Sequence, residues 1–176
     1  MLISEEYRSQ LQEAHEQEDW GTSSPMFADL ISNIANQTGA GEILDYGCGK
    51  AHLGKHLKLD HPARVFLYDP AIEKFSKTPD PRDMVVCTDV LEHIEPDLLD
   101  DVLDDLQRVT KSVGFFNVCT LPAIKILPDG RNAHLIQEPM EWWLPKLMER
   151  FAIKSLADTG VGFWLVVSNK EIKDGH

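Results

Sequence analysis

The segment Ile43-Leu44-Asp45-Tyr46-Gly47-Cys48-Gly49-Lys50 decides how the rest of this sequence is interpreted. A short apolar run ends in an aspartate and is followed at once by Gly-x-Gly, and a helix-compatible segment over about residues 52–59 comes next. This pattern predicts a strand, a tight glycine turn and the start of a helix. Because glycine has no Cβ and tolerates positive φ, such a turn lets a ligand approach the backbone. Many strands end in Gly-x-Gly, so the ligand must be inferred from the rest of the chain.

Outside this segment, predicted strands alternate with predicted helices. Apolar runs typical of buried strands are separated by segments whose apolar residues recur with the helical period. The alternation predicts a doubly wound, mostly parallel α/β sheet, that is, a three-layer Rossmann-like fold. A short turn joins the last two strands, so we expect one antiparallel strand near the C-terminus. The predicted strands after residue 46 are 64–68, 84–87, 113–118, 151–156 and 163–168, and the predicted helices are 4–18, 25–38, 98–109 and 140–150.

Composition restricts the possible partners. The 176 residues include 17 basic and 29 acidic side chains, a net charge of -12, so attraction to nucleic-acid phosphates is not expected to drive binding. The three cysteines are widely spaced and form no Cys-x-x-Cys pair, so we predict neither a disulfide framework nor a metal site. No apolar run approaches the roughly 20 residues that span a bilayer, and the N-terminus lacks a basic signal region. We therefore expect a cytoplasmic protein without a membrane partner; its oligomeric state is left open.

Three consecutive strands end in an aspartate. Asp45, Asp69 and Asp89 each follow an apolar run. The carboxyl ends of parallel strands meet at one edge of the sheet, and ligands of such folds bind there. Any one of these aspartates could serve only to cap a turn, but three at the same edge favour a ligand site.

At these positions the chain resembles the class I S-adenosylmethionine (AdoMet)-dependent methyltransferases. Residues 43–49 are similar to their first motif, hydrophobic-hydrophobic-Asp-hydrophobic-Gly-x-Gly, and Asp69 stands where they close the second strand with an acidic residue. Residues 87–94, Cys-Thr-Asp-Val-Leu-Glu-His-Ile, resemble their fourth-strand motif, commonly Asp-x-Leu-Glu-His. The three motifs occur in the right order over residues 42–94. The resemblance implies AdoMet as the cofactor and S-adenosylhomocysteine (AdoHcy) as its product.

The resemblance also implies roles for individual residues. Asp69 would accept both ribose hydroxyls, and Asp45 would contact the methionine ammonium directly or through water. Tyr46 and Tyr68 could flank the sulfonium or the adenine, while His93 would either pack near the cofactor or bond to the backbone at a helix start. The residues expected at the cofactor are Trp20, Gly21, Asp45, Tyr46, Gly47, Cys48, Gly49, Tyr68, Asp69, Pro70, Thr88, Asp89, Val90 and His93.

The chain departs from the family pattern after Asp69. A complete fold has a helix, a third strand and another helix there, but only about a dozen residues are present before Met84, so we expect the third strand to be abbreviated or missing. The adenine-contacting motif that usually follows this strand is not identifiable. We expect a single domain over residues 1–176, made of an N-terminal helical lid (1–38), a cofactor-binding part (42–118), an acceptor loop and helix (119–150) and a C-terminal hairpin (151–176).

The acceptor side is expected in the long polar loop after residue 118, since loops of this length are uncommon unless functional or disordered. His134 is the predicted general base and catalytic residue. Arg131 could bind an acceptor carboxylate or phosphate, and Asn132 and Trp142 complete the predicted substrate site. Two alternatives stay open: the loop is held only by its own hydrogen bonds, and no base is needed because the sulfonium is already activated.

We therefore predict an AdoMet-dependent methyltransferase that acts on an O or N atom of a small molecule. The Asn/Asp-Pro-Pro-aromatic motif of base methylation is absent, which, with the acidic charge, argues against nucleic acid as the acceptor. One alternative is a non-catalytic AdoMet-binding or interaction module. Another is a dinucleotide-dependent oxidoreductase, which is disfavoured because the glycine after Gly49 is Gly54, too far along for a dinucleotide fingerprint.

Overall fold

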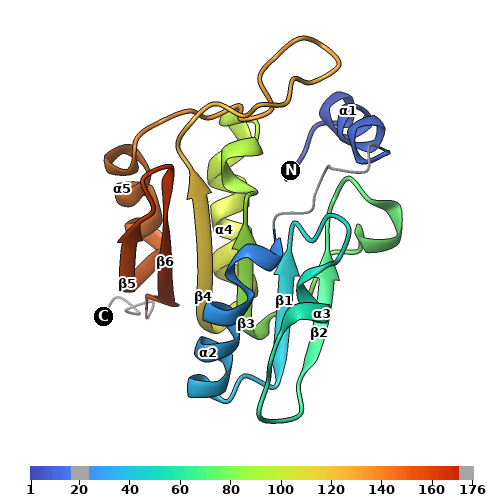
Figure 1. Ribbon diagram of the computed structural model, residues 1–176. Helices are drawn as coiled ribbons and strands as arrows, with labels where there is room; N and C mark the ends of the chain where they lie inside the picture. Colours follow the sequence, from blue (N-terminus) through green and yellow to red (C-terminus); the bar gives the residue numbers. More distant parts are fainter. Residues whose placement is uncertain (17–23, 171–176) are drawn as a thin grey trace, which may run out of the picture.

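The computed structural model describes residues 1–16 and 24–170, which form a six-stranded sheet with helices on both faces (Figure 1). The strands run in the order β2-β1-β3-β4-β6-β5, and all pairings are parallel except those of β6 with β4 and β5. This confirms the predicted mostly parallel α/β sheet with one antiparallel strand near the C-terminus. The strands are β1 (Glu42–Tyr46), β2 (Arg64–Tyr68), β3 (Arg82–Thr88), β4 (Thr110–Cys119), β5 (Phe151–Asp158) and β6 (Gly162–Asn169).

The third strand of the family's sheet is missing, as the short spacing predicted. Between β2 and β3 the structure has only the 3-10 turn η2 (Glu73–Phe75), so β2 is an edge strand. Strand β1 pairs with β2 on one side and with β3 on the other, so the chain order reverses at β1. In sheets of this type, ligands bind beyond the carboxyl ends of the strands at such a switch point.

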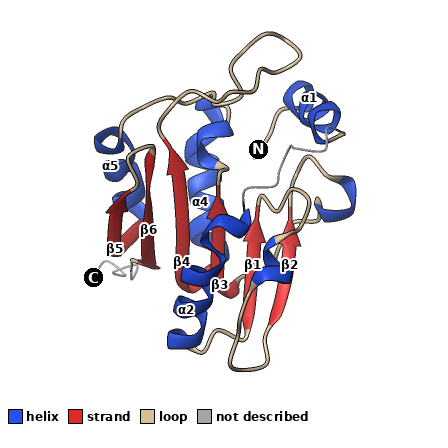
Figure 2. Ribbon diagram, in the orientation of Figure 1, coloured by secondary structure: helices blue, strands red, loops and turns tan. Residues whose placement is uncertain are grey.

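Two apolar clusters hold helices to opposite faces of the sheet (Figure 2). On one face, Ile31 of α2 belongs to the same cluster as Phe115 of β4, and on the other face Leu103 of α4 belongs to the cluster of Phe116. Neighbouring side chains of β4 thus serve opposite faces, as the strand period requires. The described helices are α1 (Glu5–His15), α2 (Ala28–Thr38), α3 (Leu53–His56), α4 (Leu99–Val109) and α5 (Met140–Arg150), with 3-10 turns η1 (Ser24–Phe27), η3 (Leu91–His93) and η4 (Pro96–Leu98). None of these helices combines the length and the apolar character needed to cross a membrane.

The helix after the glycine turn is shorter than predicted. The pattern predicts a helix over about residues 52–59, whereas α3 ends at His56 because Leu57 is extended, with φ -70° and ψ 137°. The chain then turns against α2, where Lys58 N donates a hydrogen bond to Ser32 Oγ (2.9 Å). This tertiary bond replaces a further helical turn.

Gly47 brings together the loops that follow β1 and β3. Its φ of 79° is a conformation that glycine adopts without strain. A Cβ at Gly47 would lie 2.3 Å from Cγ2 of Val90, so a larger residue does not fit between the two loops. Among the described residues, the non-glycine residues with positive φ are Ala51, after β1, and Asp89, after β3. Strain of this kind concentrates at functional sites, and here it lies on both sides of the switch point.

We predict that Gly47→Ala destabilises the protein more than Gly130→Ala does. Both glycines have positive φ, 79° and 88°, so both substitutions strain the backbone by about 1–2 kcal/mol. At Gly130, however, no atom of the described chain other than Gly130 and its two neighbours in the sequence lies within 4 Å of the added Cβ. The free energy of unfolding, measured by chemical denaturation, should therefore fall by about 1–3 kcal/mol more for Gly47→Ala. Equal losses would contradict the contact with Val90.

Candidate cofactor and acceptor site

Asp69 ties the glycine loop to the end of β2. Its Oδ2 atom accepts a hydrogen bond from Gly49 N (3.0 Å), and its Oδ1 atom accepts one from Ala71 N (3.0 Å). Gly47 N also donates to the carbonyl of Tyr68 (2.7 Å). A carboxylate offers about four lone pairs, so each oxygen of Asp69 can accept a further hydrogen from a ligand. The loop and the end of β2 are therefore fixed relative to one another around an acidic group that retains acceptor capacity.

Two buried oxygens at this edge have no hydrogen-bond partner among the described residues. They are Oδ2 of Asp45, at the end of β1, and Oγ1 of Thr88, at the end of β3. Asp45 lies opposite Val86 in the sheet, two residues before Thr88, so both side chains point to the α2 face. Burial, and then the nearby Asp69 carboxylate, raise the pKa of Asp45 to about 7. The edge thus presents two oxygens without a partner in the described chain, and the Asp45 carboxyl favours a ligand that carries positive charge and hydrogen-bond donors.

The rings of Tyr46 and Tyr68 lie on the other face of the sheet. Their centroids are 4.9 Å apart within the apolar cluster beneath α4, and the Tyr46 hydroxyl donates to Asp105 Oδ2 (2.8 Å). This packing corrects the prediction that the two rings flank the cofactor, because strand alternation directs them away from Asp45. Both tyrosines therefore support the site through the core.

Four other residues predicted to bind the cofactor are Cys48, Pro70, Trp20 and Gly21, and the structure describes the first two of them. The Cys48 thiol is buried in the glycine loop, and burial raises its pKa. Pro70 is half-buried and follows Asp69 directly. Trp20 and Gly21 lie outside the described residues.

The predicted catalytic residue, His134, lies beside His93 and Asp89. The Nε2 atoms of His93 and His134 are 3.8 and 4.0 Å from the same Asp89 oxygen, Oδ1. The two imidazole rings meet edge to face, with centroids 4.7 Å apart. Each ring bonds a backbone carbonyl through Nδ1, His93 to Ala133 (2.8 Å) and His134 to Leu121 (2.5 Å). The sequence analysis named each of the three residues as a candidate, but it did not predict that they form one cluster.

The two histidines have opposite pKa shifts. Burial lowers the pKa of His134, and the neighbouring His93 adds to this. Burial also acts to lower the pKa of His93, but the Asp89 and Glu92 carboxylates and a backbone bond outweigh it and raise the pKa. Such a separation of pKa values is common where one group holds a proton and its neighbour accepts one.

Glu92 lies beside the candidate site, and the sequence analysis assigned it no role. It is fully buried, and its Oε1 atom accepts a hydrogen bond from Cys119 N (2.6 Å) at the end of β4. Its carbonyl accepts a further bond from Ile136 N (3.0 Å). Burial raises the pKa of Glu92 to about 7. Glu92 therefore connects η3 to β4 and to the long loop. The Glu-His pair of the fourth-strand motif was the sequence feature that could have identified Glu92 as important.

Two of the residues predicted to bind the acceptor, Arg131 and Asn132, form their hydrogen bonds within the loop itself. Arg131 Nε donates to Asp129 Oδ2 (2.7 Å), and its guanidinium lies 5.9 Å from the centre of the Tyr7 ring. Asn132 Oδ1 accepts hydrogen bonds from the backbone N–H groups of Ala123 and His134, both at 2.9 Å, and its Nδ2 donates to the Ala123 carbonyl. These contacts agree with the alternative that the loop is held by its own hydrogen bonds.

Trp142 also packs against its own helix rather than against the histidines. Its ring stacks edge to face on Trp143, with centroids 5.1 Å apart, and the ammonium of Lys146 lies 4.6 Å from its centre. Within the described chain, His134 is thus the predicted acceptor residue that reaches the cluster.

Helix α1 lies beyond the carboxyl ends of the strands, beside the long loop (Figure 1). Buried Tyr7 donates from its hydroxyl to the carbonyl of His93 (2.7 Å), and Ser4 N donates to Glu95 Oε2 (2.8 Å). Tyr7 also belongs to a small apolar cluster with Ala71, after β2, and Ala133, in the long loop. Helix α1 therefore joins the cofactor side of this edge to the acceptor side.

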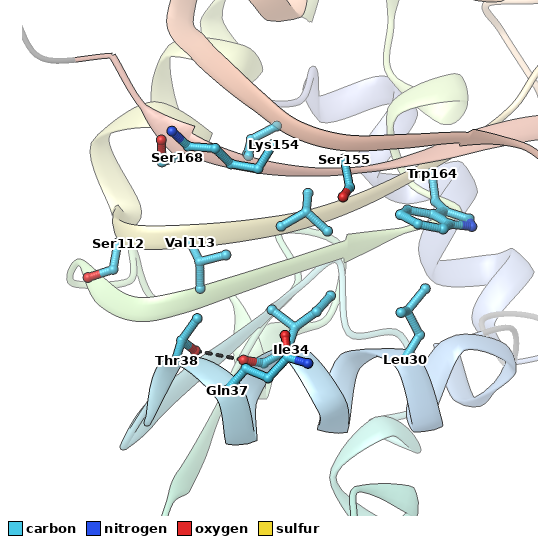
Figure 3. A pocket seen from close by; sticks show the side chains of 12 residues that line it. Leu30, Ile34, Gln37, Thr38, Ser112, Val113, Lys154, Ser155, Trp164 and Ser168 are labelled. Carbon is cyan, nitrogen blue, oxygen red and sulfur yellow. Dashed lines mark hydrogen bonds between the residues drawn. The ribbon is translucent and has the colours of Figure 1, made fainter.

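A separate groove lies on the α2 face of the sheet, away from this edge. Figure 3 shows its walls, with Leu30 and Ile34 of α2 opposite Ser155 and Trp164 of the terminal hairpin. None of the residues predicted to bind cofactor or acceptor lines it. The groove is therefore not part of the candidate site.

A protein-family comparison identifies the chain. The sequence profile of a methyltransferase domain matches residues 13–158, so the chain belongs to this methyltransferase-domain family. The match agrees with the three motifs, and the protein is a class I AdoMet-dependent methyltransferase. No curated protein matches the sequence significantly.

Solved structures show the same fold. The Burkholderia thailandensis 1,6-didemethyltoxoflavin-N1-methyltransferase, crystallised with 1,6-didemethyltoxoflavin and AdoHcy, is 15% identical, with a TM-score of 0.65 over 97% of this chain and 92% of that one. DhpI in complex with AdoHcy is 16% identical, with a TM-score of 0.60 over 92% and 94%. A putative type 11 methyltransferase from Sulfolobus solfataricus is 16% identical, with a TM-score of 0.57 over 84% and 95%.

We predict that Asp45→Asn makes the ligand-free protein more stable at neutral and basic pH. The unfolded carboxyl loses its proton near pH 3.8, whereas the folded one keeps it to about pH 7. Between these values the folded state binds more protons, so its stability falls as the pH rises, and asparagine removes this effect. The advantage of the variant, measured by chemical denaturation, should grow up to about pH 7 and then level off.

The same variant should bind AdoHcy at least about tenfold more weakly, because a buried charge-assisted hydrogen bond to the ligand ammonium is lost. Calorimetry at about pH 8 measures this affinity, and Asp60→Asn, on the exposed surface, is the control. An unchanged affinity in Asp45→Asn would show that Asp45 does not face the ammonium.

Proposed function

We propose that this protein transfers the methyl group of AdoMet to an oxygen or nitrogen atom of a small molecule. The observation that carries the proposal is the pair of buried acceptors, Asp45 Oδ2 and Thr88 Oγ1, at the switch point beside Asp69. The methionine ammonium of AdoMet supplies a positive charge and N–H donors to these two oxygens. The acidic net charge and the small-molecule acceptor of the didemethyltoxoflavin methyltransferase support an acceptor of this size.

In the proposed complex, Asp69 accepts hydrogen bonds from the ribose hydroxyls, and Gly47 and Gly49 admit the middle of the cofactor. Asp69 already accepts two backbone N–H groups, which fix the rotamer of its carboxylate before the ligand binds. A preorganised carboxylate binds two adjacent hydroxyls with less loss of entropy than a free side chain would. Adenine lies toward the Pro70-Ala71-Ile72 segment, since the strand that usually precedes its contacts is missing.

The transfer itself is an in-line displacement. A lone pair of the acceptor atom forms a bond to the methyl carbon, the carbon–sulfur bond breaks, and AdoHcy leaves as a neutral thioether. The acceptor proton passes to Nε2 of His134, which is free to take it when Nδ1 donates to the Leu121 carbonyl. Because the sulfonium is already activated, positioning by the long loop supplies most of the acceleration.

We further propose that residues 1–38 act as a lid over residues 42–118, with residues 119–150 bearing the acceptor and residues 151–176 completing the sheet. The contacts of Tyr7 with His93 and with the apolar cluster support this division, since they join α1 to both sides of the site. Trp20 and Gly21 belong to the proposed lid.

We predict that Asp69→Ala weakens AdoMet binding by about 1–3 kcal/mol, or about 5- to 150-fold, the scale of lost hydrogen bonds to a charged group. Calorimetry with AdoMet measures the change, and Asp60→Ala, whose carboxylate is exposed, should leave the affinity unchanged. A parallel titration with NAD should show no binding. Failure of the wild type to bind AdoMet, or equal affinity in Asp69→Ala, would overturn the proposal.

A screen for methyl transfer from labelled AdoMet into fractions of a cell extract then identifies the acceptor. Label in small molecules that depends on the wild-type protein and disappears with Asp45→Asn supports the proposed acceptor class. Label only in proteins or nucleic acids would contradict it.

A further inference from the structure

We propose that Asp89, His93 and His134 bind one divalent transition-metal ion. Suitable ligand atoms of these three residues all lie within 4.8 Å of one another. The metal site itself is independent of the proposed function, because a sulfonium donor needs no metal, and only the effect of the ion on an acceptor proton rests on that function.

The hydrogen bonds of the two imidazoles decide which nitrogen faces the cluster. A backbone carbonyl can only accept, so the Nδ1 atoms of His93 and His134 must both be donors to Ala133 and Leu121. In a neutral ring the lone pair then lies on Nε2. Both Nε2 atoms face the same Asp89 oxygen, at 3.8 and 4.0 Å. Three lone-pair donors therefore converge on one point.

A positive charge at the centre of this cluster, either a proton or a metal ion, interacts favourably with all three groups. The separations of 3.8 and 4.0 Å also meet the criterion for an ion pair, so a proton and a metal ion compete for the place between these atoms. The separations are suited to a metal ion, because ligand bonds of about 2.0–2.2 Å place neighbouring donors roughly 3–4 Å apart. Nδ1 bonds to backbone carbonyls are also the usual outer contacts that orient metal-binding histidines.

The segments that carry the ligands are held in place by bonds independent of an ion. Asn132 Oδ1 accepts a hydrogen bond from His134 N, and the Tyr7 hydroxyl donates to the carbonyl of His93. Beneath the cluster, a carboxylate oxygen of fully buried Glu92 lies within 4.8 Å of a His134 nitrogen. Its Oε2 atom has no hydrogen-bond partner among the described residues. This second carboxyl group places a further oxygen atom beside the cluster.

Two imidazoles and one carboxylate favour a transition ion of the zinc, cobalt or manganese type over magnesium or calcium, which prefer oxygen ligands. Glu92 and Cys119 form a second possible set with His134. We favour the Asp89 set, because Glu92 Oε1 is already bonded to Cys119 N and the Cys119 thiol lies 3.3 Å from the Val161 carbonyl. The sequence analysis predicted no metal because it relied on cysteine pairs, whereas these ligands come from distant segments.

A bound ion takes the lone pair of His134, so in the metal-bound form His134 is a ligand, and the ion replaces the acid–base role that the proposed function assigns to His134. Three protein ligands leave coordination positions open for water or an acceptor oxygen, whose pKa the ion lowers. The proton of an acceptor hydroxyl then passes to solvent before the oxygen attacks the methyl carbon. This favours an oxygen acceptor.

The test is calorimetric and spectroscopic titration of the full chain with Co²⁺ and with Zn²⁺, after treatment with a chelator and removal of any affinity tag. We expect one equivalent of either ion to bind and Co²⁺ to develop visible ligand-field absorption. His134→Gln and His93→Gln should each weaken binding at least about tenfold. The exposed His56→Gln is the matched control and should bind as the wild type does.

AdoHcy affinity, measured on the same preparations, separates this proposal from the proposed function. A wild type that binds AdoHcy but neither ion would overturn the metal site alone, as would ion binding that survives both histidine substitutions. A wild type that binds Co²⁺ but not AdoHcy would leave the metal site standing and overturn the proposed function. Far-UV circular dichroism of each variant confirms that lost binding is not lost folding.

Discussion

The candidate site depends on the two hydrogen bonds that Asp69 accepts from the loops on either side of it. Gly49 N and Ala71 N approach opposite oxygens of one carboxylate, so the turn after β1 and the turn after β2 share a single anchor. The contact between Gly47 and Val90 adds the turn after β3 to this assembly. Glu92 and Cys119 N add the end of β4. Four strand ends are thus linked through short polar and apolar contacts.

The repeated use of buried carboxylates has a thermodynamic consequence. Asp45 and Glu92 both have pKa values raised to about 7 by burial, so the ligand-free protein near neutral pH contains acidic groups that resist ionisation. A positively charged ligand stabilises the ionised form of these buried carboxyl groups, and it therefore binds the folded state selectively. The ionised Asp45 carboxylate therefore favours ligand binding but lowers the stability of the ligand-free protein, a trade-off that is common at binding sites.

Much of the fold could be predicted from the sequence, because apolar runs that end in Asp45, Asp69 and Asp89 identify parallel strands and their ligand edge. The short length of α3 could not be predicted in this way, because the chain after α3 forms a tertiary hydrogen bond between Lys58 and Ser32. Strand alternation alone predicts that the side chains of Tyr46 and Tyr68 point away from Asp45. The sequence analysis placed both rings beside the cofactor instead, because aromatic rings attract a sulfonium.

The cluster of His93 and His134 was beyond sequence reasoning for a different reason. The two residues belong to segments that are adjacent only because the long loop folds back over η3, and hydrogen bonds of Asn132 and Glu92 fix that path. No local period or motif spacing encodes such a contact. Arg131, by contrast, is a residue type that often binds anionic ligands, but in the structure its guanidinium donates a hydrogen bond to Asp129, two positions away in the sequence.

The loss of the third strand leaves β2 with one unpaired row of backbone groups, and an open strand edge is a template for association with other chains. This edge is protected in two ways. β2 is only five residues long, and two arginines cover its central Phe66, Arg82 at 3.9 Å and Arg64 at 5.3 Å from the ring centre. Both arginines pair with Glu42, and Arg82 also pairs with Asp80, so charged side chains surround this short strand. A short edge strand beside charged side chains is a poor template for another chain, and the shortened sheet is protected against intermolecular strand pairing in this way.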